Sequence, residues 1–358
     1  MNHQNTTQQH QRNSNLELLR VLCMIMIVSH HYAVHSQWDS SLVGSTPILN
    51  ILFVQIISLG GKLAVNVFVL ISGYFLVKES FSVKRLLLLL GNVYLFSLAN
   101  LVVVYGFRLS VFDMALFVRS LFPTLFSAYW FFTTYILLYL TTPLLNRMIQ
   151  SLSEHRHRWI CVSVLVLWSV VPTVLNVTFG FSELIWFMSV YLIGAYIRLY
   201  VTPSRYQAWK KRIVMIWLFN VVFLIFSVLV IDMLALKQPE LFEKATYFSD
   251  LNRLPSVLIA LSLFVGFCFA RPRFLRLINR LASHTFGIYL IHDHPLMRHL
   301  IWVQWLNTAA FQTNPFLPLH AVGVISVVFG LSLGIVVLKQ RLIDPSFRNM
   351  IDWLIRKT

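Results

Sequence analysis

Long apolar stretches separated by short polar breaks recur along the whole chain, and no other feature restricts its fold as strongly. A helix needs about 20 mostly apolar residues to cross a bilayer. Only 12% of the 358 residues are charged, against about 25% in a soluble domain. We therefore expect an all-α polytopic membrane protein with about ten transmembrane helices, at 16–36, 48–77, 86–106, 128–149, 159–178, 183–200, 212–234, 252–270, 283–306 and 317–338.

The remaining segments are short. Residues 110–126 are apolar but contain Asp113, Arg119 and Pro123, so we expect an interfacial or re-entrant piece there. The sequence divides into a disordered tail at 1–15, a single membrane-embedded domain at 16–340 and a basic tail at 341–358.

The basic residues indicate the orientation in the membrane. With the N-terminus placed inside, roughly three quarters of the 29 lysines and arginines fall in inside segments, as the positive-inside rule requires. Both termini are therefore predicted to be cytoplasmic, and the protein is predicted to be a multi-pass protein of the plasma membrane. Topology accounts for the net charge of +16, so we expect no nucleic-acid partner.

The first predicted helix contains costly polar groups. Arg20 and His31 lie 11 residues apart, which is about three helical turns, or roughly 16 Å along the axis. Together with Met24 and Ile27 they form one stripe, whereas His30 lies roughly 80° round the helix. Ionisable residues in a membrane helix usually mark a functional site. The alternative is structural: Arg20 extends to the interface and His31 bonds a neighbouring helix.

These residues and three further stretches resemble the membrane-bound acyltransferase-3 family. An arginine, ten residues and a histidine in the first helix is that family's signature. "GKLAVNVFVLISGYFLV", "YWFFTTYILLYLTTPLLNRMI" and "SHTFGIYLIHDHPLMR" are similar to its later segments. The resemblance covers roughly 14–340 and is closest to the branch that O-acetylates sugars. It implies an integral membrane O-acyltransferase of surface polysaccharides.

The chain departs from the family pattern in two places. The family often has H-x-P late in the chain, but here the run is His292-Asp293-His294-Pro295, so either histidine can fill that role. The family's first cytoplasmic loop often has two spaced arginines, and here the loop offers Lys78, Lys84 and Arg85.

Acyl transfer to a hydroxyl needs a base and a donor for the developing oxyanion. Histidine is the usual base near neutral pH, and phosphates of a donor such as acetyl-CoA need cations. We predict that His31 and Arg20 are catalytic and that Arg20, Lys84 and Arg85 bind the donor.

Five further residues are predicted to bind the substrate: Asn66, Trp130, Glu183, Tyr289 and His292. Packing is the alternative role for Asn66, a place at the membrane interface for Trp130, and a favourable charge at a helix start for Glu183. Thr285, Tyr289, His292 and His299 would form one polar stripe on the helix at 283–306.

The predicted function is transfer of an acyl group, most plausibly acetyl, from cytoplasmic acyl-CoA to a hydroxyl of a cell-surface or lipid-linked glycan. Acyl-CoA, the glycan and membrane lipid are the expected partners. No metal motif is present, so neither a metal nor a tightly bound cofactor is expected. One alternative is a transporter or flippase for a lipid-linked sugar, which the lack of paired interrupted helices disfavours. Another is a membrane scaffold or sensor. The oligomeric state cannot be predicted.

Overall fold

The structure is a computed structural model that describes residues 13–177, 180–235 and 237–357, and this part of the chain contains helices and no strand. The α-helices are α1 (Ser14–His35), α2 (Ile48–Ser58), α3 (Gly60–Leu76), α4 (Val83–Gly106), α5 (Met114–Leu121), α6 (Trp130–Gln150), α7 (Glu154–Leu165), α8 (Val171–Leu175), α9 (Glu183–Tyr200), α10 (Pro203–Ala235), α11 (Leu254–Cys268), α12 (Arg276–Ala282), α13 (Thr285–His292), α14 (Pro295–His299), α15 (Leu317–Leu342) and α16 (Asp344–Lys357). Two π-helical turns (Val166–Val170 and Leu300–Trp305) and four 3₁₀ turns (Ser40–Ser45, Pro239–Lys244, Tyr247–Ser249 and Thr308–Phe311) complete the described helical structure.

The polytopic all-α fold is confirmed. Within the described residues, 8 helical segments are long and apolar enough to cross a membrane. Two predicted spans are not among them, 128–149, which is α6, and 283–306. The count of ten crossings therefore stays a prediction. The outer helices α10 and α15 expose large apolar side chains such as Phe219, Met233 and Leu331, as helices in contact with lipid do.

The expectation of one continuous helix at 283–306 is wrong, because the chain breaks after His292. His294 has an extended backbone (φ −63°, ψ 134°) and its ring accepts a hydrogen bond from the Leu296 amide, so it caps α14. Pro295 occupies the first turn of α14, and the residue before a proline is driven away from helical angles. The break moves His299 off the predicted polar stripe, and its side chain is exposed.

A second interruption occurs between α7 and α8, again at a proline. Pro172 has no amide hydrogen to donate to the carbonyl four residues earlier. That carbonyl, on Trp168, accepts instead from the Asn252 side chain at 2.8 Å, and the Pro172 carbonyl accepts from Arg253. The loop before α11 therefore satisfies both the Trp168 carbonyl that the proline releases and the Pro172 carbonyl of α8, as the interior of a membrane requires.

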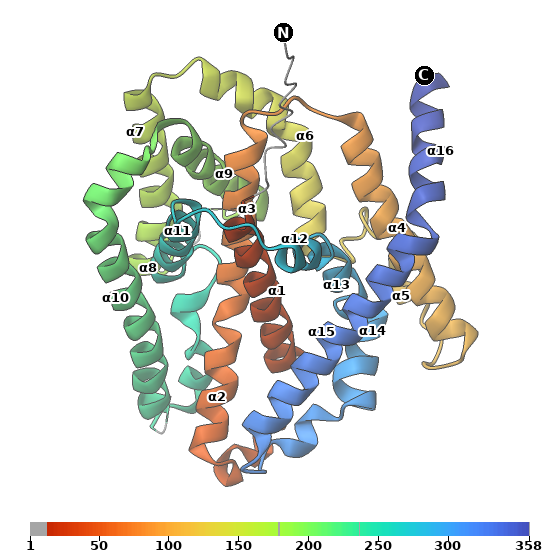
Figure 1. Cartoon of the computed structure of the whole chain (residues 1–358). Helices are drawn as coiled ribbons and strands as arrows, with labels where there is room; N and C mark the ends of the chain where they lie inside the picture. The colour runs from red at the N-terminus through yellow and green to blue at the C-terminus, as the bar shows by residue number, and fades with distance from the viewer. Residues whose placement is uncertain (1–12, 178–179, 236, 358) are drawn as a thin grey trace.

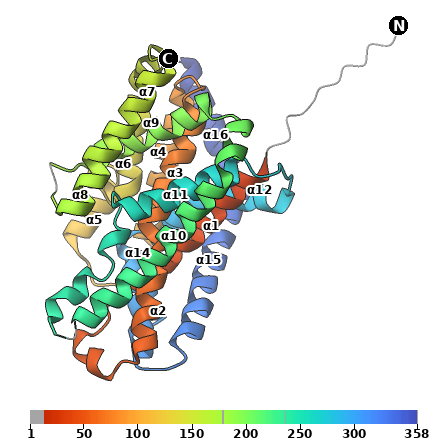
Figure 2. The same ribbon diagram turned by 90° about the vertical axis from the view of Figure 1, so that its left-hand side faces the viewer.

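Helix α3 lies in the middle of the bundle between α1 and α9, whereas α10 and α15 lie on opposite flanks (Figures 1 and 2). Glycines allow the close approach of α3 and α9. A β-carbon on Gly73 would lie 2.3 Å from the Tyr191 carbonyl oxygen, and one on Gly194 would lie 2.5 Å from the Leu70 carbonyl oxygen. Small residues at such contacts are typical of packed membrane helices.

The ends of the helices form two separate sets of contacts. Lys84 pairs with Asp352 at 2.5 Å, and Arg205 pairs with Glu154 at 2.5 Å. All four belong to segments predicted inside. In the other set, Gln312 bonds Asp39, from a segment predicted outside, and Asn50, at the outer end of the predicted span 48–77. The contacts agree with the predicted alternation, while the side on which each terminus lies stays a prediction.

The minor segments have short helices. Residues 110–126 contain only the eight-residue α5, too short to span a bilayer. The predicted C-terminal tail folds largely as α16, which packs against α4. The predicted N-terminal tail, 1–15, lies almost entirely outside the described residues, and α1 begins at Ser14.

Candidate active site

A cavity of about 290 Å³ lies inside the bundle, among α1, α3, α6 and α13. Arg20, Met24, Ile27 and His31 all line it. The predicted stripe of α1 therefore faces a single cavity, as helical periodicity predicted. The other lining residues are His30, Gly61, Lys62, Val65, Phe68, Ile71, Ser72, Leu89, Trp130, Phe131, Tyr135, Ala282, Thr285, Phe286 and Tyr289.

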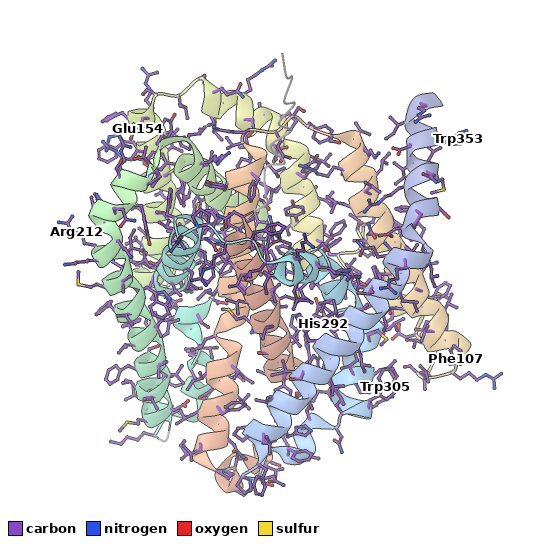
Figure 3. All side chains as sticks on the ribbon, in the orientation of Figure 1. Phe107, Glu154, Arg212, His292, Trp305 and Trp353 are labelled. Carbon is purple, nitrogen blue, oxygen red and sulfur yellow. The ribbon has the colours of Figure 1, made fainter. Side chains whose placement is uncertain are left out.

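A chain of hydrogen bonds orients the His31 ring. Nδ1 of His292 lies 2.6 Å from the Ile288 carbonyl oxygen, and because a carbonyl only accepts, this nitrogen must hold a hydrogen. Nε2 of neutral His292 is then an acceptor, so Nδ1 of His31, 2.9 Å away, is the donor. His31 Nε2 is left with its lone pair free. Figure 3 shows His292 in the interior of the bundle.

The buried Asp293 follows directly and faces three basic groups. One of its oxygens, Oδ1, lies 3.6 Å from Nε2 of His31 and 3.5 Å from Nε2 of His35. The same oxygen accepts a hydrogen bond from Nε of Arg298 at 2.8 Å. A carboxylate here favours a positive charge on His31 after the ring has taken up a proton. The cluster thus has the parts of a general base: an oriented ring, a free nitrogen and a nearby anion.

Sequence reasoning missed Asp293, His35 and Arg298. The sequence could have indicated His35, because it lies four residues after His31 and therefore on the same face of α1. Asp293 had a weaker signal, its place in the His-Asp-His-Pro run at a helix break. His294 was the alternative late histidine, but it bonds Ser97 at 3.0 Å and not the His31 cluster. The structure thus brings His292 to His31.

The predicted donor cations are separated. Arg20 lines the cavity, pairs with Glu17 at 2.7 Å and lies 5.6 Å from the centre of the Phe75 ring. Lys84 and Arg85 do not line it. Lys84 pairs with Asp352 and Arg85 with Glu79, and both side chains are more than two-fifths exposed. Their role in donor binding stays a prediction.

His30 differs from His31 in its contacts. Its Nδ1 lies 2.7 Å from the carbonyl oxygen of Ser58 at the end of α2, so it bonds a neighbouring helix. It also lines the cavity, which the 80° offset did not predict. Gly61 explains this proximity, because a β-carbon there would lie 2.2 Å from the His30 ring.

Of the five predicted substrate residues, two line the cavity and three do not. Trp130 and Tyr289 line it, whereas the buried His292 instead bonds His31. Asn66 is buried away from the cavity, where it donates to the Leu251 carbonyl at 2.7 Å and accepts from Trp186 at 2.9 Å. These contacts fit the packing alternative. Glu183 is exposed and lines a neighbouring cavity.

The same cluster offers ligand atoms for a cation. Atoms of His31, His35 and Asp293 lie within 4.8 Å of one another, a spacing that one metal ion could bridge. The Arg298 guanidinium, however, bonds the carboxylate oxygen nearest both histidines, and a cation at that point opposes a second one. The donor set is better suited to holding a proton.

A bundle of apolar helices around a buried histidine–carboxylate cluster is an arrangement suited to an enzyme embedded in a membrane. A family model described as an acyltransferase domain matches residues 13–338. The chain therefore belongs to the acyltransferase-3 family, and it is a membrane acyltransferase. Searches of curated proteins and of solved structures found no match.

Proposed function

We propose that the protein transfers an acetyl group from cytoplasmic acetyl-CoA to a hydroxyl of a cell-surface or lipid-linked glycan, with His31 as the general base. The observation that supports this most directly is the free Nε2 of His31, in a ring oriented by His292 and faced by Asp293. The cavity runs from Arg20, at the end of α1 predicted inside, to Lys62 and Trp130, at helix ends predicted outside. Donor and acceptor can therefore enter from opposite ends.

In the proposed acetyl transfer, His31 Nε2 takes the proton of the acceptor hydroxyl, whose oxygen attacks the thioester carbonyl carbon. The carbon–sulfur bond then breaks, and the proton on His31 passes to the departing thiolate of coenzyme A. The Asp293 carboxylate stabilises the imidazolium while it exists. Tyr289 lines the cavity, and we assign its hydroxyl as the donor to the oxyanion on the attacked carbonyl.

The test compares two adjacent histidines. Membranes that contain the protein are given acetyl-CoA with a labelled acetyl group, and labelled glycan is measured per amount of inserted protein. His31→Ala should lower transfer by roughly 10²–10⁴-fold, the usual contribution of a general base. His30→Ala is the matched control and should lower it by less than about tenfold, because its Nδ1 is held by the Ser58 carbonyl.

Near-normal transfer by His31→Ala together with a complete loss in His30→Ala would reverse the assignment of the base. Retention of activity in both variants would move the base off α1, and His292 would be the next residue to replace. No labelled glycan from the unaltered protein would refute the donor, the acceptor or both.

A further inference from the structure

A second cavity of about 570 Å³ adjoins the active site. Its walls come from four helix ends and loops that the charge distribution places outside: the start of α3, the start of α6, the α8–α9 connection and the loop before α11. Its lining includes the polar and aromatic residues Lys62, Trp130, Glu183, Asp250, Asn252 and Arg253.

The two cavities have a common wall. Lys62 and Trp130 line both of them, and the Lys62 ammonium lies 4.5 Å from the centre of the Trp130 ring. A ligand in the second cavity that reached past these two side chains would enter the space lined by His31. The second cavity, which we call the outer cavity, is therefore placed to hold the part of the acceptor that does not react.

The outer cavity combines the groups that a sugar needs. Sugar hydroxyls both donate and accept hydrogen bonds, and the faces of a pyranose ring present C–H groups. Glu183 and Asp250 offer carboxylate oxygens, and both are exposed and have no ion pair within the described part of the chain. Trp130 offers a flat apolar surface. Such a mixture of an aromatic wall and a few polar groups is typical of a small-molecule site.

Arg253 provides a second observation at this site. Its side chain is only 8% exposed. It donates to the Pro172 carbonyl and to Asn176 and lies 4.0 Å from the centre of the Tyr247 ring. Its Nε–H, however, is buried without a hydrogen-bond partner among the described residues. A buried donor of this kind is costly unless something accepts from it, and a sugar oxygen in the outer cavity would do so.

The charges select the kind of sugar. Lys62 and Arg253 are positive, Glu183 and Asp250 are negative, and all four line the outer cavity. The lining therefore has no formal net charge, and it offers no surplus of cations to hold a carboxylate or phosphate on the bound ring.

We propose that the outer cavity binds an uncharged saccharide, the part of the acceptor next to the acylated hydroxyl, through Glu183, Asp250, Arg253 and the Trp130 ring. This inference rests on the proposed function, since it gives that acceptor a binding site.

The experiment separates acceptor binding from donor use. Membranes with the full-length double variant Glu183→Gln/Asp250→Asn, and others with Trp130→Ala, receive labelled acetyl-CoA. Two rates are measured per inserted protein: labelling of the glycan, and hydrolysis of acetyl-CoA in membranes stripped of glycan. Glycan labelling should fall roughly tenfold or more, about the value of one hydrogen bond to a charged group. In the double variant, hydrolysis should stay within about twofold, because Glu183 and Asp250 do not line the cavity that contains Arg20 and His31.

Glu243→Gln is the matched control, because Glu243 is an exposed carboxylate in a loop predicted outside and does not line the outer cavity. Its glycan labelling should equal that of the unaltered protein. Trp130→Phe keeps a ring for stacking and should recover most of the activity that Trp130→Ala loses.

Normal glycan labelling in the double variant would overturn the proposal, and so would an equal fall in both rates. Extraction into organic solvent then distinguishes a lipid-linked saccharide from a water-soluble polysaccharide. Label in either fraction agrees with the proposal, because both kinds of acceptor can present an uncharged sugar. Label confined to sugar rings with a carboxylate or phosphate would overturn the uncharged acceptor. If the unaltered protein labels no glycan, the proposed function fails instead.

Discussion

At the scale of single residues, the candidate site depends on which atom of each histidine is already engaged. His31 and His30 are adjacent in the sequence, and both line the cavity. Nδ1 of His30 bonds a backbone carbonyl. Nδ1 of His31 bonds the ring of His292, and Nε2 of His31 lies near Asp293. These contacts, rather than their exposure, are the reason that we propose His31 as the base and His30 as a helix contact.

A prediction at the same scale concerns the donor. Arg20→Gln should raise the KM for acetyl-CoA roughly tenfold, because a charge-assisted bond to phosphate is lost. Lys84→Gln/Arg85→Gln should raise it about threefold and should affect the KM for the glycan less, because these side chains are exposed and ion-paired outside the cavity. Steady-state kinetics with both substrates varied provides the measurement. An unchanged donor KM in Arg20→Gln would move the phosphates elsewhere, for example to Arg271–Arg280.

The residue scale also shows how far the sequence could predict the site. Arg20 and His31 share a helix, so the period of that helix was enough to place both in one cavity. His292 lies 261 residues from His31, and no local pattern reports contacts across such a distance; the family resemblance indicated it. Asp293 could not be placed from the sequence, because it lies in the break between α13 and α14, where helical periodicity no longer applies. Its carboxylate contacts His31 and His35 of α1.

At the scale of elements, prolines and glycines decide where helices break and how closely they pack. Apolar runs predicted most helix positions, because burial in lipid requires them. They could not predict the interruptions at Pro172 and Pro295, since hydrophobicity does not change there. The rule for the residue before a proline was the available signal at His294. The α3–α9 contact depends on Gly73 and Gly194, which hydrophobicity alone does not distinguish from other glycines.

The glycine contact gives the second prediction. Gly73→Ala and Gly194→Ala should each lower the free energy of unfolding by about 1–3 kcal/mol, because a new β-carbon would collide with backbone that cannot move aside cheaply. Thermal unfolding of the purified protein in detergent is the measurement. Gly330→Ala is the control, since nothing lies within 4 Å of the added carbon, and it should unfold at or slightly above the original temperature. Equal stability of all three variants would mean that α3 and α9 are packed less closely.

At the scale of the whole molecule, the contacts between helix ends divide into two groups, and each joins segments that the charges place on one side. This grouping agrees with the predicted alternation of the loops, and the side of the membrane on which each group lies stays a prediction. The long outer helices with their exposed apolar residues surround a core built on α1, α3 and α9 (Figure 1).

The prediction for the whole molecule concerns which parts of the chain lie on each side of the membrane. A reporter fused after Thr358 should be active in the cytoplasm, and one inserted in 236–250 should be active outside, because roughly three quarters of the basic residues lie on the side of the N-terminus. Paired reporters that are active only in opposite compartments provide the measurement. Reversed signals would also place Arg20 at the outer end of the cavity and exclude a cytoplasmic donor there.

The triple contact of Asp293 has a consequence for the charge of the site through a reaction cycle. With both histidines neutral, the Asp293 carboxylate and the Arg298 guanidinium cancel, and the cluster has no net charge. A proton on His31 makes the cluster a monocation for as long as the proton remains. In the proposed mechanism, the positive charge therefore exists only while the attacked carbonyl oxygen and the departing sulfur are negative. The same mechanism returns the buried centre to electroneutrality between turnovers, which is the least costly condition for ionisable groups surrounded by hydrocarbon.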